Sequence, residues 1–168
     1  RPDVLKRLEG VVQTLNRVQQ VVRFSLDDYS ADLSIPLRFD ANDKAFVEPT
    51  STVAVARFHL SSTGAINDPT IIFPSVSYVD HVGWFEMVLM HEVGHVLGLW
   101  HTPSGVPGVM SAILLGAGTD FSDAEKTTFR THYTRSPGTK LKDRIEYEDV
   151  VARSSDGTRE VSIACPLG

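Results

Sequence analysis

Apolar side chains recur every three or four positions over residues 4–22. This spacing places them on one face of a helix, and Pro2 and Asp3 suit its first turn. We therefore predict an amphipathic helix of about twenty residues that packs against the rest of the protein along one side. Its apolar positions are Val4, Leu8, Val11, Leu15, Val18 and Val22.

Extended segments follow this helix. Residues 22–27 and 32–40 are predicted to be strands, joined by a turn at residues 28–30. A polar stretch then leads to residues 52–60, where the alternation of apolar side chains indicates a further strand. Residues 70–73 are predicted to form a short buried strand. The predicted order is therefore one helix followed by two pairs of strands.

A second long helix is expected after these strands. Asp80 is a suitable N-cap residue, and the mostly apolar sequence that follows continues to about Leu99. Near its end the helix carries His91 and His95, four positions apart. Both imidazoles therefore leave the same face, one turn above the other. Two neutral imidazoles at this spacing can bind one Zn²⁺ at about 2.0–2.1 Å per bond.

Three nearby residues complete the expected site. Glu92 follows the first histidine, where its carboxylate can reach a metal-bound water. Gly98 can adopt a positive φ without steric penalty, so the helix can end there and the chain can turn back. That reversal lets His101 supply a third ligand. Three protein ligands leave one coordination position open, which is typical of a catalytic zinc site, whereas a structural site has four.

The whole pattern is His-Glu-x-x-His-x-x-Gly-x-x-His over residues 91–101. Met110 follows in a segment whose Pro107 and Gly108 suit a tight turn. This long motif with a later methionine turn is the signature of the metzincin peptidases. The alternative is an amphipathic helix whose histidines happen to face solvent, and it requires five constrained positions to coincide by chance.

On these residues the chain resembles the metzincin zinc endopeptidases, and it is most similar to the matrixins, the matrix metalloproteinase-like catalytic domains. Thr102 is similar to the Ser or Thr that matrixins carry after the third histidine. Ala112 differs from the Tyr that astacins and serralysins use there as an extra zinc ligand. Residues 121–133 resemble the C-terminal helix of the family. The resemblance is strong over residues 91–133 and weaker over residues 3–73.

The resemblance implies an α+β fold with a twisted mixed sheet of four to five strands, a backing helix, an active-site helix and a C-terminal helix. We expect a single metalloprotease catalytic domain over residues 1–168. Residues 1–101 would form an upper subdomain with the sheet and the zinc helix. Residues 102–136 would form a lower subdomain with the methionine turn and the C-terminal helix, and residues 137–168 would be an extension.

Composition agrees with one compact enzyme domain. Hydrophobic residues make up 42% and charged residues 22% of the 168 residues, and both values are ordinary for a globular protein. The net charge of −5 argues against nucleic acid and anionic membranes as partners. No apolar run reaches the ~20 residues needed to span a bilayer. We expect a monomer that acts on a polypeptide substrate.

Cysteine content and the chain start bear on localisation. Cys165 is the only cysteine, so an internal disulfide is excluded. The chain begins at Arg1 and carries no signal peptide. We therefore expect a protein that is secreted or released from a precursor.

Two departures from the matrixin pattern concern the first strand and the C-terminus. Matrixins place a strand inside the sheet before their first helix, whereas this chain starts with the helix. Residues 145–151 and 161–163 alternate apolar and polar positions around a suitable hairpin turn at Asp156-Gly157. This hairpin could fill the vacant sheet position or cover a sheet edge. The alternative is a tail without fixed structure.

A further departure concerns accessory metals. Matrixins hold a structural zinc and calcium ahead of the active-site helix, but residues 57–74 offer only His59 and Asp68 as ligands. One His and one Asp cannot enclose a four-coordinate zinc or supply the 6–8 oxygens typical of calcium. We expect one catalytic Zn²⁺ and no calcium. His59, His81 and His132 are expected to be surface or capping residues.

The expected mechanism follows from zinc chemistry. Zinc polarises the scissile carbonyl and lowers the pKa of its bound water toward about 7. Glu92 would accept the proton of the attacking water and return it to the leaving amine. Met110 would lie beneath the metal as an apolar side chain that does not ligate.

Substrate binding is expected to follow the resemblance. Residues 52–60 would end in an exposed edge strand that pairs with an extended peptide. The pocket for the residue after the cut bond would lie behind the zinc and prefer an apolar side chain. Met87 is equally compatible with a core position. The expected lining of the pocket is Met87, Ala112, Ile113 and Leu114.

Two other functions stay open. One is a self-processing protease of narrow specificity in a polyprotein or toxin precursor, and the other is a non-catalytic peptide-binding module, against which the intact Glu92 argues. The terminal Pro-Leu-Gly resembles the stretch that many matrixins prefer before the cut bond, which suggests self-cleavage after Gly168. Cys165 would then be a potential thiolate ligand, similar to the cysteine-based latency of matrixin zymogens. The alternative is an ordinary chain end with a buried cysteine.

Overall fold

The protein is an α+β structure, described here from a computed structural model. Its helices are α1 (Pro2–Gln19), α2 (Lys44–Val47), α3 (Trp84–Val96) and α4 (Asp123–Thr134), with a short 3₁₀ helix η1 (Val76–Asp80) before α3. Its strands are β1 (Leu37–Phe39), β2 (Thr52–Leu60), β3 (Ile66–Phe73) and β4 (Arg159–Pro166). The structure describes residues 1–19, 22–26, 30–47, 52–61, 64–103, 106–111, 120–134 and 159–166.

The four strands form one mixed sheet in the order β1-β3-β2-β4. β1 runs parallel to β3, with Leu37 opposite Ile71. β2 is antiparallel to both neighbours, β3 on one side and β4 on the other. The strand that is last in the sequence therefore lies at one end of the sheet, beside a strand from the first half of the chain.

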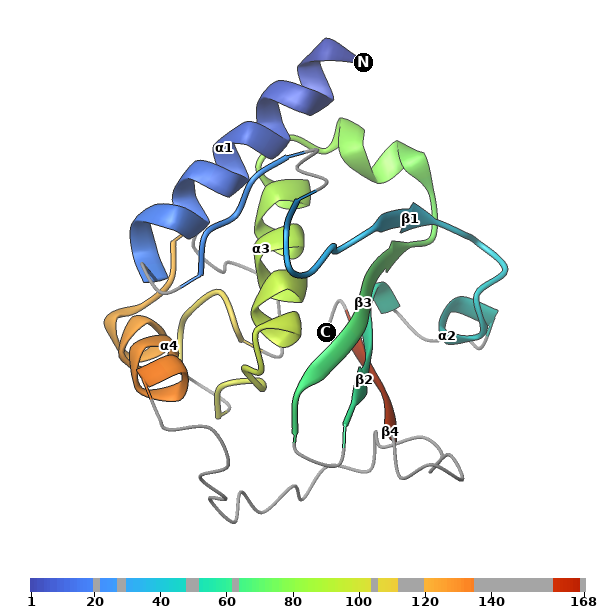
Figure 1. The fold of residues 1–168 in the computed structure, drawn as a ribbon. Coiled ribbons are helices and arrows are strands. Elements are labelled where there is room, and N and C mark those ends of the chain that lie inside the picture. Colours follow the sequence, from blue (N-terminus) through green and yellow to red (C-terminus); the bar gives the residue numbers. More distant parts are fainter. Residues whose placement is uncertain are drawn as a thin grey trace.

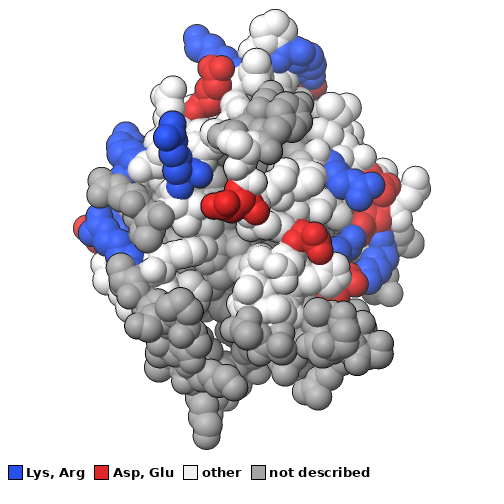
Figure 2. Space-filling view, viewed as in Figure 1, with Lys and Arg blue, Asp and Glu red and all other residues white. Residues whose placement is uncertain are grey.

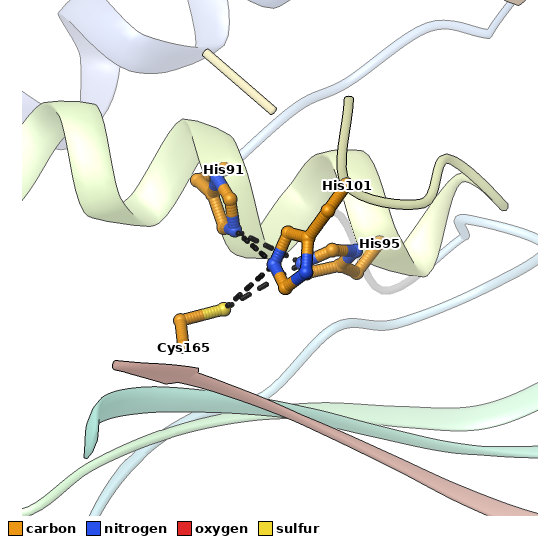
Figure 3. Close-up of side chains that lie close together, drawn as sticks. All are labelled: His91, His95, His101 and Cys165. Atoms are coloured by element: carbon orange, nitrogen blue, oxygen red, sulfur yellow. Dashed lines mark hydrogen bonds between the residues drawn. The ribbon is translucent and has the colours of Figure 1, made fainter. Parts of the chain in front are cut away.

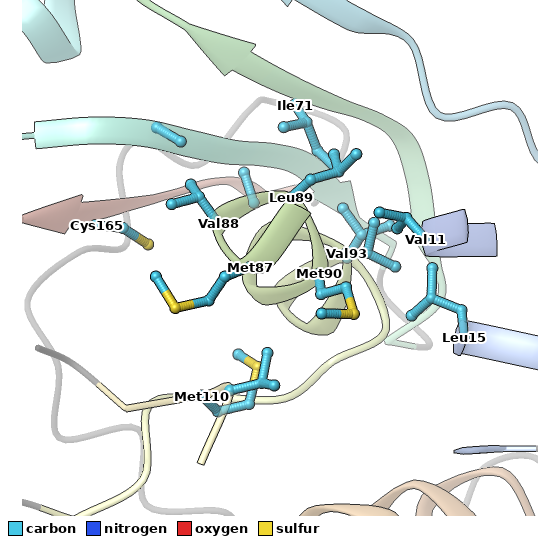
Figure 4. Close-up of a cluster of buried hydrophobic side chains, with 14 of the residues drawn as sticks. Val11, Leu15, Ile71, Met87, Val88, Leu89, Met90, Val93, Met110 and Cys165 are labelled. Carbon is cyan, nitrogen blue, oxygen red and sulfur yellow. The ribbon is translucent and has the colours of Figure 1, made fainter. Parts of the chain in front are cut away.

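Helix α3 crosses the sheet and is the centre of the core. Ala54 and Ala56 of β2 are fully buried, and their small side chains allow the helix to approach the strand closely. On the other side of α3, Val11 and Leu15 of α1 complete the core (Figure 4). α3 thus lies between the sheet and α1, while α4 packs near the C-terminal part of α1 (Figure 1).

An ion pair connects α1 to the start of α3. The Arg7 guanidinium donates two hydrogen bonds to the Glu86 carboxylate, at 2.5 and 2.9 Å, and a third to the carbonyl of Val79. Glu86 also accepts from the backbone N–H of Gly83 at 2.6 Å, which satisfies one of the unpaired donors at the helix start. Arg7 lowers the pKa of Glu86 below its usual value. Because both side chains are largely buried, the pair fixes the approach of α1 to α3.

Several sequence predictions are confirmed. The first helix forms where the apolar repeat places it, from Pro2 to Gln19. The strand predicted over residues 52–60 has the same bounds in the structure. The short strand expected at residues 70–73 is the buried end of β3, which begins earlier, at Ile66. The C-terminal helix begins at Asp123, as part of the segment expected to be helical.

The strand predicted over residues 22–27 is wrong for its described part, residues 22–26. The Asn16 side chain binds both backbone groups of Phe24, donating to its carbonyl at 2.9 Å and accepting from its N–H at 2.8 Å. These groups are therefore not available to a strand ladder. Of the strand predicted over residues 32–40, only Leu37–Phe39 pairs with a neighbour.

The start of the zinc helix also differs from its prediction. Asp80 is the last residue of η1 and pairs with Arg1, so it does not cap α3. The helix begins at Trp84 after Gly83, whose φ of 81° breaks the helical path. It ends at Val96, three residues before the predicted Leu99.

β2 is not the exposed edge strand that was expected, because β4 pairs with it from Thr52 to Leu60. Within the C-terminal hairpin that was predicted, Val161 and Ile163 belong to β4 and therefore cover an edge of the sheet. The other strand of that hairpin and its turn lie outside the described residues. Covering an edge removes unpaired backbone groups from solvent.

Acidic and basic side chains are interspersed on the face shown in Figure 2, so neither sign forms a continuous patch among the described residues of that face. None of the described helices has both the length and the apolar character to cross a bilayer.

Candidate metal centre

Helix α3 supplies the first two candidate ligands. His91 and His95 are fully buried, and their Nε2 atoms lie 3.0 Å apart. The four-residue spacing predicted this convergence, because it stacks the two rings on one helix face.

The end of α3 brings in the third ligand. Gly98 has a φ of +86°, and the N–H groups of Gly98 and Leu99 bond to the carbonyls of His95 and Gly94, each at 2.9 Å. These two bonds form a Schellman motif, which ends the helix and reverses the chain. The Nε2 atom of His101 consequently lies 3.2 Å from that of His91. The predicted role of Gly98 is confirmed.

Backbone carbonyls hold two of the rings in place. Nδ1 of His91 donates to the carbonyl of Val109 at 2.5 Å, and Nδ1 of His95 donates to the carbonyl of Leu99 at 2.8 Å. Each bond places the ring proton on Nδ1 and leaves the Nε2 lone pair directed at the shared centre. The rings are thus in the tautomer that metal binding requires.

Met110 packs directly beneath α3. A Cβ at Gly94 would lie only 2.2 Å from the sulfur of Met110, so this helix position has no room for a side chain. Met110 itself is fully buried. Met110, which the sequence analysis expected beneath the metal, therefore lies against the helix that carries His91 and His95.

The segment around Met110 is fixed from two sides. The N–H of Thr102 donates to the carbonyl of Met110 at 2.8 Å. The buried carboxylate of Glu125 accepts from the N–H of Met110 and from that of Ser122, each at 2.6 Å. Helix α4 therefore positions the loop that supports the histidines. The role of Glu125 was missed, although Ser122-x-x-Glu125 is a capping-box pattern that the sequence shows.

A fourth candidate ligand comes from β4. The sulfur of Cys165 lies 3.5 Å from Nε2 of His95 and 3.8 Å from Nε2 of His101 (Figure 3). Cys165 is buried, and the pairing of β2 with β4 shifts its register next to this residue, between Thr52 and Ala54. Such a bulge redirects nearby side chains. The three-histidine motif predicts an open coordination position here, and the sequence also offered Cys165 as a potential thiolate ligand; the structure places the Cys165 sulfur at this position.

The spacing of these atoms fits a tetrahedral metal ion. Around Zn²⁺, bonds of about 2.0–2.1 Å to nitrogen and about 2.3 Å to sulfur put the donors roughly 3.3 Å (nitrogen to nitrogen) and roughly 3.5 Å (nitrogen to sulfur) apart. The distances of 3.0, 3.2, 3.5 and 3.8 Å come close to these values. All four donor atoms lie within 4.8 Å of one another. His91, His95, His101 and Cys165 can therefore bind one metal ion.

The histidines are neutral in this environment. Burial lowers the pKa of His91 to about 4 and holds the pKa of His95 well below its usual value. Neighbouring imidazoles add to both shifts, since two positive rings so close would repel each other. Neutral imidazoles are the form that binds a metal ion near pH 7.

Glu92 is buried beside the same group. Among the described residues, neither of its carboxylate oxygens has a hydrogen-bond partner. Burial raises the pKa of Glu92 to about 8, and the nearby Cys165 side chain and Ala56 backbone oppose this shift without overcoming it. A buried carboxylate without partners is costly, and a nearby cation or a bound water would compensate it. The unpaired carboxylate is thus a second observation that fits a metal centre.

Of the predicted pocket residues, Met87 lies in the part of the chain that the structure describes. Met87 is buried in the main core, which fits its core alternative (Figure 4). Ala112, Ile113 and Leu114 lie outside the described residues, as does Gly168. His59 lies 3.8 Å from Asp68, and both side chains are largely exposed.

Comparisons with known proteins give no assignment: no family model matches this chain, and no curated protein and no solved structure matches it.

Proposed function

We propose that the protein is a zinc-dependent endopeptidase. The observation that carries the proposal is the convergence of three imidazole Nε2 atoms on one point, with a buried, unpaired carboxylate on the residue after the first histidine. The metzincin-like motif over residues 91–101 supports the same conclusion.

Zinc is the metal that we propose for this site. Three imidazoles and one thiolate are borderline-soft donors, which suit zinc better than magnesium or calcium. A set of histidine and cysteine ligands is typical of tetrahedral zinc sites. When bound, zinc would supply Lewis-acid chemistry, polarising a carbonyl and acidifying a water.

Glu92 is the proposed general base. Its carboxylate lies between α3 and the β2–β4 part of the sheet, close to Ala56 and Cys165. Because no described residue hydrogen-bonds to this carboxylate, it is available to take a proton from the attacking water and to pass it to the leaving amine. His91 and His95 are held by backbone carbonyls, so the base and the ligands keep a fixed geometry.

The proposed substrate is an extended peptide. A peptide can add to a strand by main-chain hydrogen bonds, and β2 leads toward the ligand group at its Thr52 end, opposite Cys165 of β4. The proposed preference after the cut bond is an apolar side chain.

One observation favours a second function. Four protein ligands are typical of a structural zinc site, and Cys165 completes such a set. In that case the chain would be a metal-stabilised, non-catalytic peptide-binding module. The two functions make opposite predictions for Cys165: its loss opens a catalytic site but weakens a structural one.

A pair of variants tests the peptidase proposal. We compare zinc-loaded Cys165→Ala with zinc-loaded Cys165→Ala/Glu92→Gln, measuring zinc content by metal analysis and cleavage of a peptide library by mass spectrometry. We expect equal zinc content and a loss of about 10²–10⁴ in cleavage rate on removing the base. If both variants bind zinc and neither cleaves any peptide, the proposal is wrong.

A further inference from the structure

A cavity lies between helices α1 and α3, where segments 22–26 and 31–37 border it. Figure 1 shows these segments beside the two helices. The volume of the cavity is about 820 Å³, which falls within the about 300–1,000 Å³ typical of sites for small molecules. The cavity is therefore large enough to hold a ligand of moderate size.

Helix α3 separates this cavity from the candidate metal centre. Leu89 and Val93 of α3 line the cavity, whereas His91 and His95 carry candidate ligand atoms. With 3.6 residues per turn, the two pairs leave opposite faces of the helix. Figure 4 shows Leu89 and Val93 on the side of α3 away from Cys165. The cavity is thus a site distinct from the metal centre.

The chemistry of the lining points to one class of ligand. Most of the lining consists of aliphatic side chains from α1, α3 and the bordering segments. Among the described residues that line the cavity, Arg23 is the only Lys, Arg, Asp or Glu, so no described carboxylate of the lining neutralises it. Arg23 is exposed, which places its guanidinium at the opening of the cavity. An aliphatic interior with one cation at its opening fits a molecule with an apolar chain and an anionic head.

Backbone contacts fix the segments that border the cavity. The side chain of Asn16 on α1 binds both backbone groups of Phe24. The N–H of Ile71 on β3 donates to the carbonyl of Pro36 at 3.0 Å. Near this second anchor, Leu33 lines the cavity but is 45% exposed. An apolar ligand in the cavity would remove part of this surface from water, which is favourable.

We propose that the cavity binds an amphiphile with an aliphatic chain and an anionic head, of the class of medium-chain fatty acids. The chain lies among the aliphatic side chains of α1 and α3. The Arg23 guanidinium pairs with the carboxylate at the opening, in the bidentate geometry that suits these two groups. The site is independent of the proposed peptidase function, because none of its residues is a candidate metal ligand.

Titration calorimetry of the full chain tests the ligand class. The probe is dodecanoate below its critical micelle concentration. Butyrate supplies the same head with a short chain, and dodecyltrimethylammonium supplies the same chain with a cationic head. We expect one dodecanoate per chain, weaker binding of the cation and no saturable binding of butyrate. Absence of saturable dodecanoate binding, or equal binding of the cation, overturns the proposal.

Single substitutions then place the ligand in the cavity. Val12→Phe fills part of the cavity from α1, and Ala31→Phe fills it from an exposed position that makes less demand on the core. We expect either change to abolish saturable binding of dodecanoate. Arg23→Gln should weaken binding about two- to fivefold, as for an exposed ion pair. Arg38→Gln is the matched control, since Arg38 is exposed on β1 and does not line the cavity.

The same variants identify binding elsewhere. They leave the metal ligands unchanged, so a carboxylate bound at the metal centre would titrate equally in all of them. Circular dichroism checks that each variant keeps its helices. Equal dodecanoate affinity in the unmodified chain and in a folded Val12→Phe or Ala31→Phe chain overturns the proposal.

Two further measurements separate a ligand site from an interface between copies of the chain. Dodecanoate should raise the midpoint of thermal unfolding of the unmodified chain but not that of Ala31→Phe, because the ligand binds the folded cavity. Sedimentation velocity should show a monomer with and without dodecanoate. A dimer that Val12→Phe dissociates would assign the cavity to a second copy of the chain and overturn the proposal.

Discussion

Two regions of the molecule supply the metal ligands, and they are built differently. The segment from α3 to Met110 carries three histidines within eleven positions, residues 91–101. β4 carries one cysteine, 70 positions beyond His95. The first region is held by its own turns and loops, whereas the second is held by pairing with β2.

The difference shows in how each ligand is supported. The rings of His91 and His95 donate to carbonyls of nearby residues, and Glu125 of α4 fixes the loop below them. Cys165 reaches the site through strand pairing and the small core around Val161 and Ile163. The histidines are therefore held by contacts close to the site, whereas Cys165 is held by the pairing of two strands that are distant in the sequence.

The largest expected effect is the loss of zinc affinity when a ligand is removed from one region or from the other. Loss of a residue that only supports a metal ligand typically lowers affinity by about 10–100-fold. Because His95 is a candidate ligand itself, we expect His95→Ala to lower zinc affinity by more than this. Cys165→Ala should keep one zinc per chain, bound by three histidines. Competition with a chromogenic chelator measures both. Equal losses of zinc affinity in the two variants would show that Cys165 contributes as much to zinc binding as His95 does.

A pair of glycine substitutions tests how tightly the segment from α3 to Met110 is packed. Gly94→Ala places a Cβ against the sulfur of the fully buried Met110, so we expect a loss of about 1–3 kcal/mol in the free energy of unfolding. Gly10→Ala is the matched control in α1, where nothing lies within 4 Å of the added Cβ. It should stabilise the protein by about 0.5–1 kcal/mol. Urea denaturation followed by circular dichroism measures both changes. A stable Gly94→Ala protein would show that the methionine contact is loose.

A smaller effect concerns the pH dependence of the pairing between β4 and β2. Arg57 contacts β4 and holds Asp43 through two hydrogen bonds of 2.8 Å, which lower the pKa of Asp43 below its usual 3.8. Lys44 also lowers that pKa, and Glu160 faces Arg57 from β4. Because the folded pKa is depressed, the stabilisation is complete above the unfolded pKa and is lost as pH falls through the folded value.

We therefore expect the docking of β4 to weaken below about pH 4. Asp43→Asn should remove this part of the pH dependence at a cost of about 1–3 kcal/mol. Acid titration of unfolding free energy measures it, with the exposed Asp123→Asn on α4 as the control. An unchanged acid profile in Asp43→Asn would contradict the assignment.

Much of the site could be predicted from the sequence because its determinants are local. Residues four apart, such as His91 and His95, share a helix face wherever the helix begins or ends. Gly98 favours the chain reversal that brings His101 to the same point. The first helix and the strand at residues 52–60 followed in the same way from hydrophobic periodicity. The errors arose where a tertiary contact replaced a local preference, as when Asn16 took the backbone groups of Phe24.

The tertiary structure decided which other segments lie beside the histidines. The sequence by itself determined a three-histidine cluster with an adjacent carboxylate, since helical spacing and one glycine turn place those groups. It indicated that Val161 and Ile163 lie in a strand. The alternation of apolar and polar residues does not say which other strand this strand pairs with, or which residues lie opposite one another. The sequence offered Cys165 only as a potential thiolate ligand, and the folded chain decided that β4 lies along β2 and that the Cys165 sulfur lies 3.5 Å from Nε2 of His95. The physical reason is that helix geometry acts over a few residues, whereas strand pairing joins segments at any separation.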